Sequence, residues 1–203
     1  MIIGILGLID SGKGTMGNIL VQECKFVADS FAKPVKDAVA VIYGWDRAML
    51  EGDTKESRLW REQPDPFWSK IYGRDFTPRE AMQLMGTEAG RDNLHPDIWI
   101  HSLVHRNVDT PKLVVTDVRF LNEISAIHNL GGSLFRVKRG DEPEWWITGM
   151  RASAGDEDAI YTMKHHYKIH RSEWDWISSP NYDTIMNDGS IEDLREHVLS
   201  IFD

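Results

Sequence analysis

The clearest chemical signal in the chain lies close to its N-terminus. The segment Gly7-Leu8-Ile9-Asp10-Ser11-Gly12-Lys13 fits the pattern G-x-x-x-x-G-K. Glycines let the backbone curl until several N–H groups point into one concavity, and the lysine adds a compact positive charge. This pattern is typical of loops that hold nucleotide phosphates. We expect the nucleotide to contact Gly7, Asp10, Ser11, Gly12, Lys13, Gly14 and Thr15.

The residue after the loop lysine departs from the common form of this pattern. Many such loops have a Ser or Thr there that binds magnesium, whereas this chain has Gly14 followed by Thr15. Thr15, Asp117 or a water molecule must then take over the contact with magnesium, and the sequence leaves the choice open.

A second group of charged residues follows the most convincing strand signal. Lys112–Thr116 is a nearly continuous β-branched run, which suits a strand buried on both faces, and Asp117 and Arg119 come directly after it. In open parallel sheets, ligands bind outside the carboxyl ends of the strands. Asp117 could hold hydrated magnesium, a sugar hydroxyl or Arg119, and Arg119 could clamp a phosphate. The alternative is a purely structural Asp–Arg pair.

Weaker signals lie between these two segments. Lys36 follows the start of a helix at Pro34, where it suggests a second anion site or a solvated helix end. Arg79, Gln83 and Gly86 share one helix face, which is either a binding stripe or an ordinary surface. Trp99 is the tryptophan that we expect to stack on a flat base.

Five short apolar runs alternate with helical segments, and this rhythm predicts a mostly parallel sheet with helices on both faces. We predict helices over Gly12–Val21, from Pro34, over Leu121–Leu130 and after Ser190, which caps the last one. The predicted strands are Ile2–Leu6, Lys25–Ala28, Lys112–Thr116, Ser133–Lys138 and Tyr182–Met186.

Two regions break this rhythm. We predict that Glu51–Asp75 is an irregular surface insertion and that Thr77-Pro78-Arg79-Glu80 starts a helix with a capping box, which Gly86-Thr87 interrupts. Another helix opens at Pro96, and Asp141–Pro180 forms a mobile lobe. The prediction is therefore one domain, 1–203, with a helical insertion over about 44–106 and a lid lobe over about 141–180.

Composition excludes several classes of protein. The formal charge is −9, with 32 acidic residues against 23 basic ones, which argues against a nucleic-acid polymer or an anionic membrane as the main partner. Cys24 is the single cysteine, so neither an internal disulfide framework nor a four-cysteine zinc module can form. This cysteine usage suits a reducing cytoplasm.

Taken together, the motifs resemble the bacteriophage deoxynucleoside monophosphate kinases, a family of P-loop kinases. The combination of Gly86-Thr87 with Thr116-Asp117-Val118-Arg119 is what distinguishes this family. Further matching stretches lie in family order along the chain: Gly7–Thr15, Phe31–Asp37, Met82–Glu88, Val115–Glu123, Val137–Gly140, His170–Glu173 and Asn187–Ser190.

The resemblance implies a P-loop kinase three-layer sandwich that transfers the γ-phosphoryl group of ATP, with Mg²⁺, to a deoxynucleoside 5′-monophosphate. Lys13, Arg119 and Asp117 would serve catalysis, and Arg139, Asn187 and Gly189 would complete the ATP site. The acceptor would contact Lys36, Arg79, Gln83, Gly86, Thr87, Trp99, Asp117, Arg119 and Glu123.

Some questions stay open at this stage. Another small acceptor, such as dephospho-coenzyme A or a nucleoside, fits the same pattern, and so does a module that binds ATP without turning it over. The partners implied are small nucleotides, in the cytoplasm of a host cell if a phage encodes the chain. The accepted bases, the discrimination against ribose, the identity of lid cations among Arg139, Arg151 and Arg171, and homodimer formation are undetermined.

Overall fold

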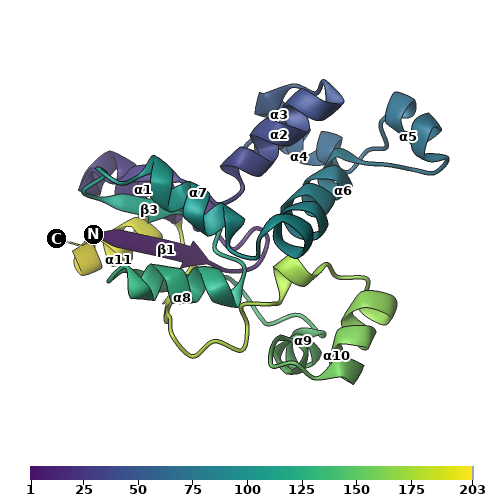
Figure 1. Ribbon diagram of the computed structural model, residues 1–203. Coiled ribbons are helices and arrows are strands. Elements are labelled where there is room, and N and C mark those ends of the chain that lie inside the picture. The colour runs from purple at the N-terminus through teal and green to yellow at the C-terminus, as the bar shows by residue number, and fades with distance from the viewer. Residues whose placement is uncertain (203) are drawn as a thin grey trace. The chain divides into compact units, whose positions relative to one another are not determined.

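The computed structural model describes residues 1–202 and divides into two compact units (Figure 1). The first unit combines Met1–Ser30 with the chain from Asn107 onward, and the second unit is Phe31–Arg106. The first unit contains the sheet and the glycine-rich loop. The second unit is helical.

The sheet of the first unit has five parallel strands in the order β2-β3-β1-β4-β5. All five predicted strands are confirmed, and so is the α/β fold class. The strands are β1 (Ile2–Leu6), β2 (Val27–Asp29), β3 (Leu113–Val115), β4 (Ser133–Lys138) and β5 (Asp183–Met186).

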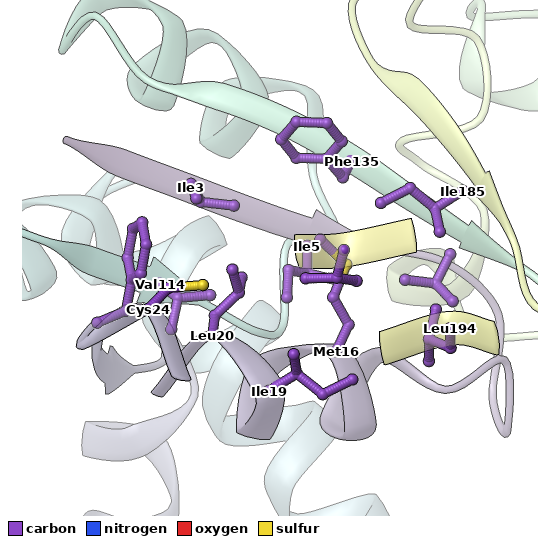
Figure 2. Close-up of a cluster of buried hydrophobic side chains, with 13 residues drawn as sticks. Ile3, Ile5, Met16, Ile19, Leu20, Cys24, Val114, Phe135, Ile185 and Leu194 are labelled. Carbon is purple, nitrogen blue, oxygen red and sulfur yellow. The ribbon is translucent and has the colours of Figure 1, made fainter. Parts of the chain in front are cut away.

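One face of the sheet is covered by α1 (Lys13–Cys24) and α11 (Ile191–Phe202). Figure 2 shows Met16 and Leu20 of α1 and Leu194 of α11 packed against Ile3 and Ile5 of the central strand. Burial of these apolar side chains is the main stabilising contribution to this unit.

The opposite face carries α8 (Leu121–Asn129), so the unit has three layers (Figure 1). Gly4 lies where this helix approaches β1. A Cβ at that position would come within 2.5 Å of Ile127 Cδ1 and 2.6 Å of Leu134 Cδ2. The chain thus uses a glycine to bring α8 close to the middle of the sheet.

The strand order sets the place of the site. The chain runs from β1 through α1 towards β2 on one side, and from β3 through α8 towards β4 on the other. Because β1 and β3 are neighbours whose connections leave in opposite directions, a crevice opens beyond their carboxyl ends. The loop after β1 and the Asp117–Arg119 segment after β3 both start at this edge.

The lobe that follows β4 in the same unit is built from short helices. They are α9 (Trp146–Ser153), α10 (Glu157–Thr162), the π-helix η2 (Met163–Tyr167) and the 3-10 turn η3 (Arg171–Glu173). Trp176 is fully buried, and the guanidinium of Arg136 on β4 lies 4.3 Å from the ring centre of Trp146. The lobe therefore has its own aromatic core, joined to the sheet through Arg136.

The second unit packs around aromatic side chains. Tyr43 stacks on Trp45 at 4.6 Å between ring centres, and Tyr72 stacks on the buried Phe76 at 4.1 Å. Its elements are α2 (Lys33–Tyr43), α3 (Arg47–Glu51), α4 (Lys55–Arg61), α5 (Pro66–Tyr72), α6 (Pro78–Gln83), the π-helix η1 (Leu84–Leu94) and α7 (Ile98–Arg106).

Two local predictions for this unit are wrong. Glu51–Asp75 is not irregular, because it contains α4 and α5, whose N-termini are capped by the side chains of Thr54 and Asp65. Gly86-Thr87 does not interrupt the helix either, because the chain continues as η1, whose wider π-turns accommodate the extra residues.

The predicted helix start at Thr77 is confirmed as an N-cap but not as a full capping box. Thr77 Oγ1 accepts the Glu80 N–H at 3.2 Å, whereas the Glu80 carboxylate accepts two hydrogen bonds from Arg74. Ser190 caps α11 as predicted and accepts the Asp193 N–H. No helix within residues 1–202 combines the length and the apolar character needed to cross a bilayer.

Candidate active site

The glycine-rich loop between β1 and α1 has the backbone that its sequence predicts. Gly7, Asp10 and Gly12 all have positive φ, at 145°, 60° and 104°. A Cβ on Gly12 would come within 2.3 Å of Asn187 Nδ2, and one on Gly7 within 2.4 Å of the Val137 carbonyl oxygen. Both the conformation and the space around the loop therefore require glycine at these positions.

This loop leads straight into α1, whose N-cap residue is Gly12 and is not assisted by any side chain of the described residues. The first turn of a helix leaves backbone N–H groups without helical partners and carries a partial positive charge. A helix start of this kind, preceded by a curled loop, is an anion-binding arrangement.

Lys13 is folded back over the loop. Its Nζ donates to the carbonyl oxygens of Gly7 at 2.9 Å and of Leu8 at 2.7 Å. Burial, together with the nearby guanidinium of Arg119, lowers the pKa of the ammonium group to about 8. The carboxylates of Glu173, Asp10 and Asp117 act in the opposite direction. The side chains of Lys13 and Arg119 are thus close enough for their charges to interact.

The lowered pKa of Lys13 predicts a pH-dependent affinity for nucleotide. Below pH 8 the lysine is mostly charged, and bound phosphates favour that form, so the affinity should fall as the pH rises above about 8. We expect a loss of up to about tenfold per pH unit until the pKa of the complex is reached. ATP titrations followed by calorimetry between pH 7 and 9.5 measure this. A flat profile for wild type would contradict it, whereas Lys13→Arg should be flat because its guanidinium stays charged.

The loop is braced by a residue from the far end of the chain. Asn187 Nδ2 donates to the carbonyl oxygen of Ser11 at 2.8 Å, and its backbone N–H donates to the Lys138 carbonyl at 2.8 Å. The next residue, Asp188, accepts the N–H of Gly140 at 2.7 Å. Asn187 therefore lies next to the loop, on the side where the family resemblance implies the ATP site. Gly189 belongs to the same turn, against the Asp193 side chain that helps cap α11.

A pocket of about 320 Å³ lies beside the loop. Asp10 and Ser11 line it from the loop, and Arg139 lines it from the chain after β4. Arg136 and Glu142, which form an ion pair at 2.7 Å, also line the pocket. The sequence analysis did not single out Arg136 or Glu142, because an ion pair across a turn has no characteristic sequence pattern.

Arg119 lies beyond β3 and is bound by the lobe. Its Nη1 forms an ion pair with the Glu173 carboxylate and contacts the carbonyl oxygen of Ser172 at 3.5 Å. The charge of Glu173 is the largest influence that raises the pKa of the Arg119 guanidinium. Asp117 is half-buried, and its charge acts on both Lys13 and Arg119. The structure thus brings Lys13, Asp117 and Arg119 together, with Glu173 as a neighbour whose role the sequence did not reveal.

The Glu123 carboxylate binds the backbone of its own chain, although the resemblance implies a contact with the acceptor. Its side chain is buried, and Oε2 accepts the backbone N–H groups of Arg119 at 2.7 Å and of Phe120 at 3.1 Å. This carboxylate closes the start of α8 and fixes the backbone that carries Arg119. Its position favours a positioning role over direct contact with an acceptor.

In the second unit, the predicted acceptor cations are held by carboxylates. Lys36 forms an ion pair with Glu51, which Arg47 also contacts, and Arg79 forms one with Glu62. Lys36 lies on α2 and Arg79 on α6, two helices that pack against each other. Arg151 in the lobe of the first unit is likewise paired, with Asp156, and Arg171 with Asp175.

Trp99 is buried inside the second unit. Its indole N–H donates to the Gly86 carbonyl oxygen at 2.7 Å, and its ring lies so close to Gly90 that a Cβ there would be 2.4 Å from Cζ2. This packing does not support the predicted stacking on a base, because neighbouring backbone covers the ring. Trp99 instead supports η1, which carries Gly86 and the buried Thr87, while Gln83 is half-buried at the end of α6.

A small cluster of two histidines and an aspartate lies in the second unit. His95, Asp97 and His101 have ligand atoms within 4.8 Å of one another. Nδ1 of His95 accepts the N–H of Asp97 at 3.0 Å, so Nε2 is the ring nitrogen that His95 could offer to a metal.

Comparison with known proteins supports the resemblance seen in the motifs. No family model matches the chain. A putative deoxynucleotide monophosphate kinase of Acanthamoeba polyphaga mimivirus is 28% identical and aligns with 100% of this chain and 96% of its own length. The deoxynucleoside-5′-monophosphate kinase of Escherichia phage T5 is also 28% identical, over 61% of this chain and 70% of its own. These two relatives confirm the resemblance to viral deoxynucleoside monophosphate kinases.

Two solved structures are distantly similar to this chain. A dephospho-CoA kinase from Campylobacter jejuni is 15% identical, with a TM-score of 0.44 over 98% of this chain and 94% of its own. A sugar kinase from Janibacter is 13% identical, with a TM-score of 0.43 over 98% of this chain and 92% of its own.

Proposed function

We propose that the chain transfers the γ-phosphoryl group of ATP to a deoxynucleoside 5′-monophosphate and releases a deoxynucleoside diphosphate and ADP. The observation that carries this proposal is the placement of Lys13 and Arg119 beyond two neighbouring strands, close enough for their charges to interact. Two cations at one switch point suit a reaction between two phosphate groups. The names of the two viral relatives support the choice of acceptor.

On the donor side, the curled loop and the start of α1 would hold the ATP phosphates. Lys13 would exchange its two loop carbonyls for phosphate oxygens, which raises its pKa again. The pocket beside the loop, with Arg139 at its wall, would take the adenine end of ATP. Asn187 and Gly189 would act by fixing the loop and the neighbouring turn.

The residues present fit a magnesium ion. Thr15 offers a half-buried hydroxyl one residue beyond Gly14, and Asp117 offers a carboxylate whose charge reaches Lys13. Oxygen ligands of this kind, completed by water, are the set that Mg²⁺ prefers. When bound, the ion would neutralise charge on the ATP phosphates. We propose Thr15 or Asp117, directly or through water, as the protein contact.

On the acceptor side, Arg119 would bind the monophosphate through its guanidinium fork. The acceptor phosphate has a second pKa near 6 and is therefore largely a dianion at neutral pH. A general base is then unnecessary, and the protein has to bring two repelling anions into line and stabilise the charge between them. Glu123 contributes by fixing the backbone of Arg119.

The remaining residues enter as proposals from the family resemblance. Lys36, Arg79, Gln83, Gly86 and Thr87 would serve the acceptor, with Trp99 supporting the helix that carries Gly86. The lobe over 141–180 would close to exclude water, which would otherwise hydrolyse ATP. We further propose that the partners are small nucleotides, not nucleic-acid polymers or membranes, and that the protein works in the cytoplasm of the host cell.

A coupled assay of ADP release across a panel of acceptors tests the proposed function. We expect at least one deoxynucleoside monophosphate to give ADP at a rate far above buffer, with phosphorylated product confirmed by chromatography. Dephospho-coenzyme A and free nucleosides serve as competing acceptors in the same panel. If dGMP, dTMP, dAMP and dCMP all gave no more ADP than buffer, the proposal would be wrong. A kinase of another acceptor would show turnover elsewhere in the panel, and a binding module would show none.

A further inference from the structure

Two groups of the turn η3 contact the guanidinium of Arg119. Glu173 forms an ion pair with Nη1, and the carbonyl oxygen of the preceding residue, Ser172, lies 3.5 Å from the same nitrogen. The Glu173 side chain is only 14% exposed, so its charge is held close to its partner. A carboxylate therefore lies on the group that the proposed function assigns to the acceptor phosphate.

The charge of Glu173 reaches both proposed phosphate-binding side chains. It is the largest influence on the pKa of Arg119, and it is the first of the carboxylates that raise the pKa of Lys13. A phosphate dianion placed on Arg119 beside Glu173 would bring like charges together in a partly desolvated place, where their repulsion is strong. Carboxylate and phosphate therefore compete for this guanidinium.

The surroundings of Glu173 allow its side chain to leave while the backbone stays. Asp175 accepts the N–H of Leu121 at 3.2 Å and pairs with Arg171 at 2.8 Å. The indole N–H of Trp176 donates to the Glu173 carbonyl oxygen at 3.1 Å. Because these contacts anchor the chain around the turn, a rotation of the Glu173 side chain would break its ion pair with Arg119 without moving the backbone.

We propose that Glu173 holds the place of the acceptor phosphate on Arg119 in the free protein and that the acceptor must displace it to bind. This inference rests on the proposed function, since it concerns the same guanidinium. The resident carboxylate satisfies Arg119 while no acceptor is present, so the charge is not left unpaired. It also weakens the binding of any anion that cannot outcompete it.

Removal of the competing charge tests this directly. Glu173→Gln keeps the shape and an amide oxygen that can accept from Arg119, so the fold should be retained. We expect the dissociation constant for the preferred deoxynucleoside monophosphate, measured by calorimetry without ATP, to fall roughly tenfold, because a neutral amide holds the guanidinium less strongly than a carboxylate and does not repel the phosphate. Inorganic phosphate serves as a second probe, and Glu173→Ala should act in the same direction. Glu144→Gln, an exposed carboxylate earlier in the same segment, is the matched control and should bind as wild type.

Two further comparisons separate the possible outcomes. The gain from Glu173→Gln should vanish in an Arg119→Ala background, because the competition is for that guanidinium. If Glu173→Gln binds the acceptor or phosphate as wild type or more weakly, Glu173 orients Arg119 instead of competing for it, and the inference is overturned. If wild type phosphorylates no deoxynucleoside monophosphate, the proposed function fails, and the comparison with inorganic phosphate still decides the role of Glu173.

Discussion

Replacement of Arg119 by Ala should lower kcat/KM for the deoxynucleoside monophosphate by at least about 10²-fold, since the variant lacks the guanidinium that would stabilise charge between donor and acceptor. Steady-state ADP release with the acceptor varied measures this. The Arg119→Lys variant should recover only part of the loss, because an ammonium group cannot form the bidentate fork.

The same measurement separates a functional Arg119 from a structural one. A structural arginine would lower the melting temperature and leave kcat/KM of the folded fraction near wild type. Arg195→Ala is the matched control. Arg195 also forms an ion pair with a glutamate, Glu23, but this pair joins α11 to α1, away from the Arg119 segment. We expect it to keep full activity. Wild-type kcat/KM in a folded Arg119→Ala protein would remove Arg119 from the mechanism.

The second large effect concerns Lys13. Lys13→Met should lower kcat by roughly 10³-fold, since the variant lacks the positive charge that would stabilise the donor phosphates in the transition state. The free protein, however, should become more stable at pH 7. The folded-state pKa of about 8 is below the value of 10.5 for a free lysine. The unfolded chain therefore binds more protons between these values, and burying the charged form costs free energy below pH 8 that is recovered as the pH rises towards 10.5.

Thermal melts at pH 7 with and without ATP, together with the kinetic assay, measure both halves of this prediction. Lys13→Met should melt higher than wild type without nucleotide and should gain less from ATP. A variant that retained turnover would contradict the assignment of the loop. A non-catalytic binding module predicts a different result. In that case Lys13→Met would bind ATP nearly as tightly as wild type, and wild type would form no product with any acceptor.

The three central strands, β1, β3 and β4, were predictable because buried parallel strands produce nearly continuous apolar runs, whatever the tertiary context. The largest shift is in β2, predicted over Lys25–Ala28 and found at Val27–Asp29. Lys25 has a φ of 61° and closes α1 by donating its N–H to the Leu20 carbonyl oxygen. A left-handed helix end of this kind usually involves glycine, so a lysine gave no signal.

The helices α4 and α5 were missed for a different reason. Each has only seven residues, and Leu59, Phe67 and Ile71 remain largely exposed. Without a buried face there is no apolar periodicity to detect. The N-cap of α5 could have been predicted from the sequence, because Asp65-Pro66 is a helix start of the same kind as Thr77-Pro78.

Within the candidate site, the local part was predictable and the long-range part was not. The loop depends on glycines and a lysine that are adjacent in sequence, so its pattern implies its geometry. Glu173 lies 54 residues from Arg119, and its pairing depends on how the lobe packs. The burial of Trp99 depends on Gly86 and Gly90 in the same way, because indole and glycine backbone fit together only in three dimensions.

The brace from Asn187 has a consequence for the biogenesis of the protein. The loop that it supports is complete within the first 15 residues of the chain, yet the hydrogen bond to Ser11 spans 176 positions. During synthesis, β1 and α1 emerge from the ribosome long before β5 and the turn that carries Asn187. The nascent chain therefore carries the glycine-rich loop without this hydrogen bond while the 176 positions up to Asn187 are being synthesised. The hydrogen bond that supports Ser11 can therefore form only after β5 and the turn that carries Asn187 have been synthesised.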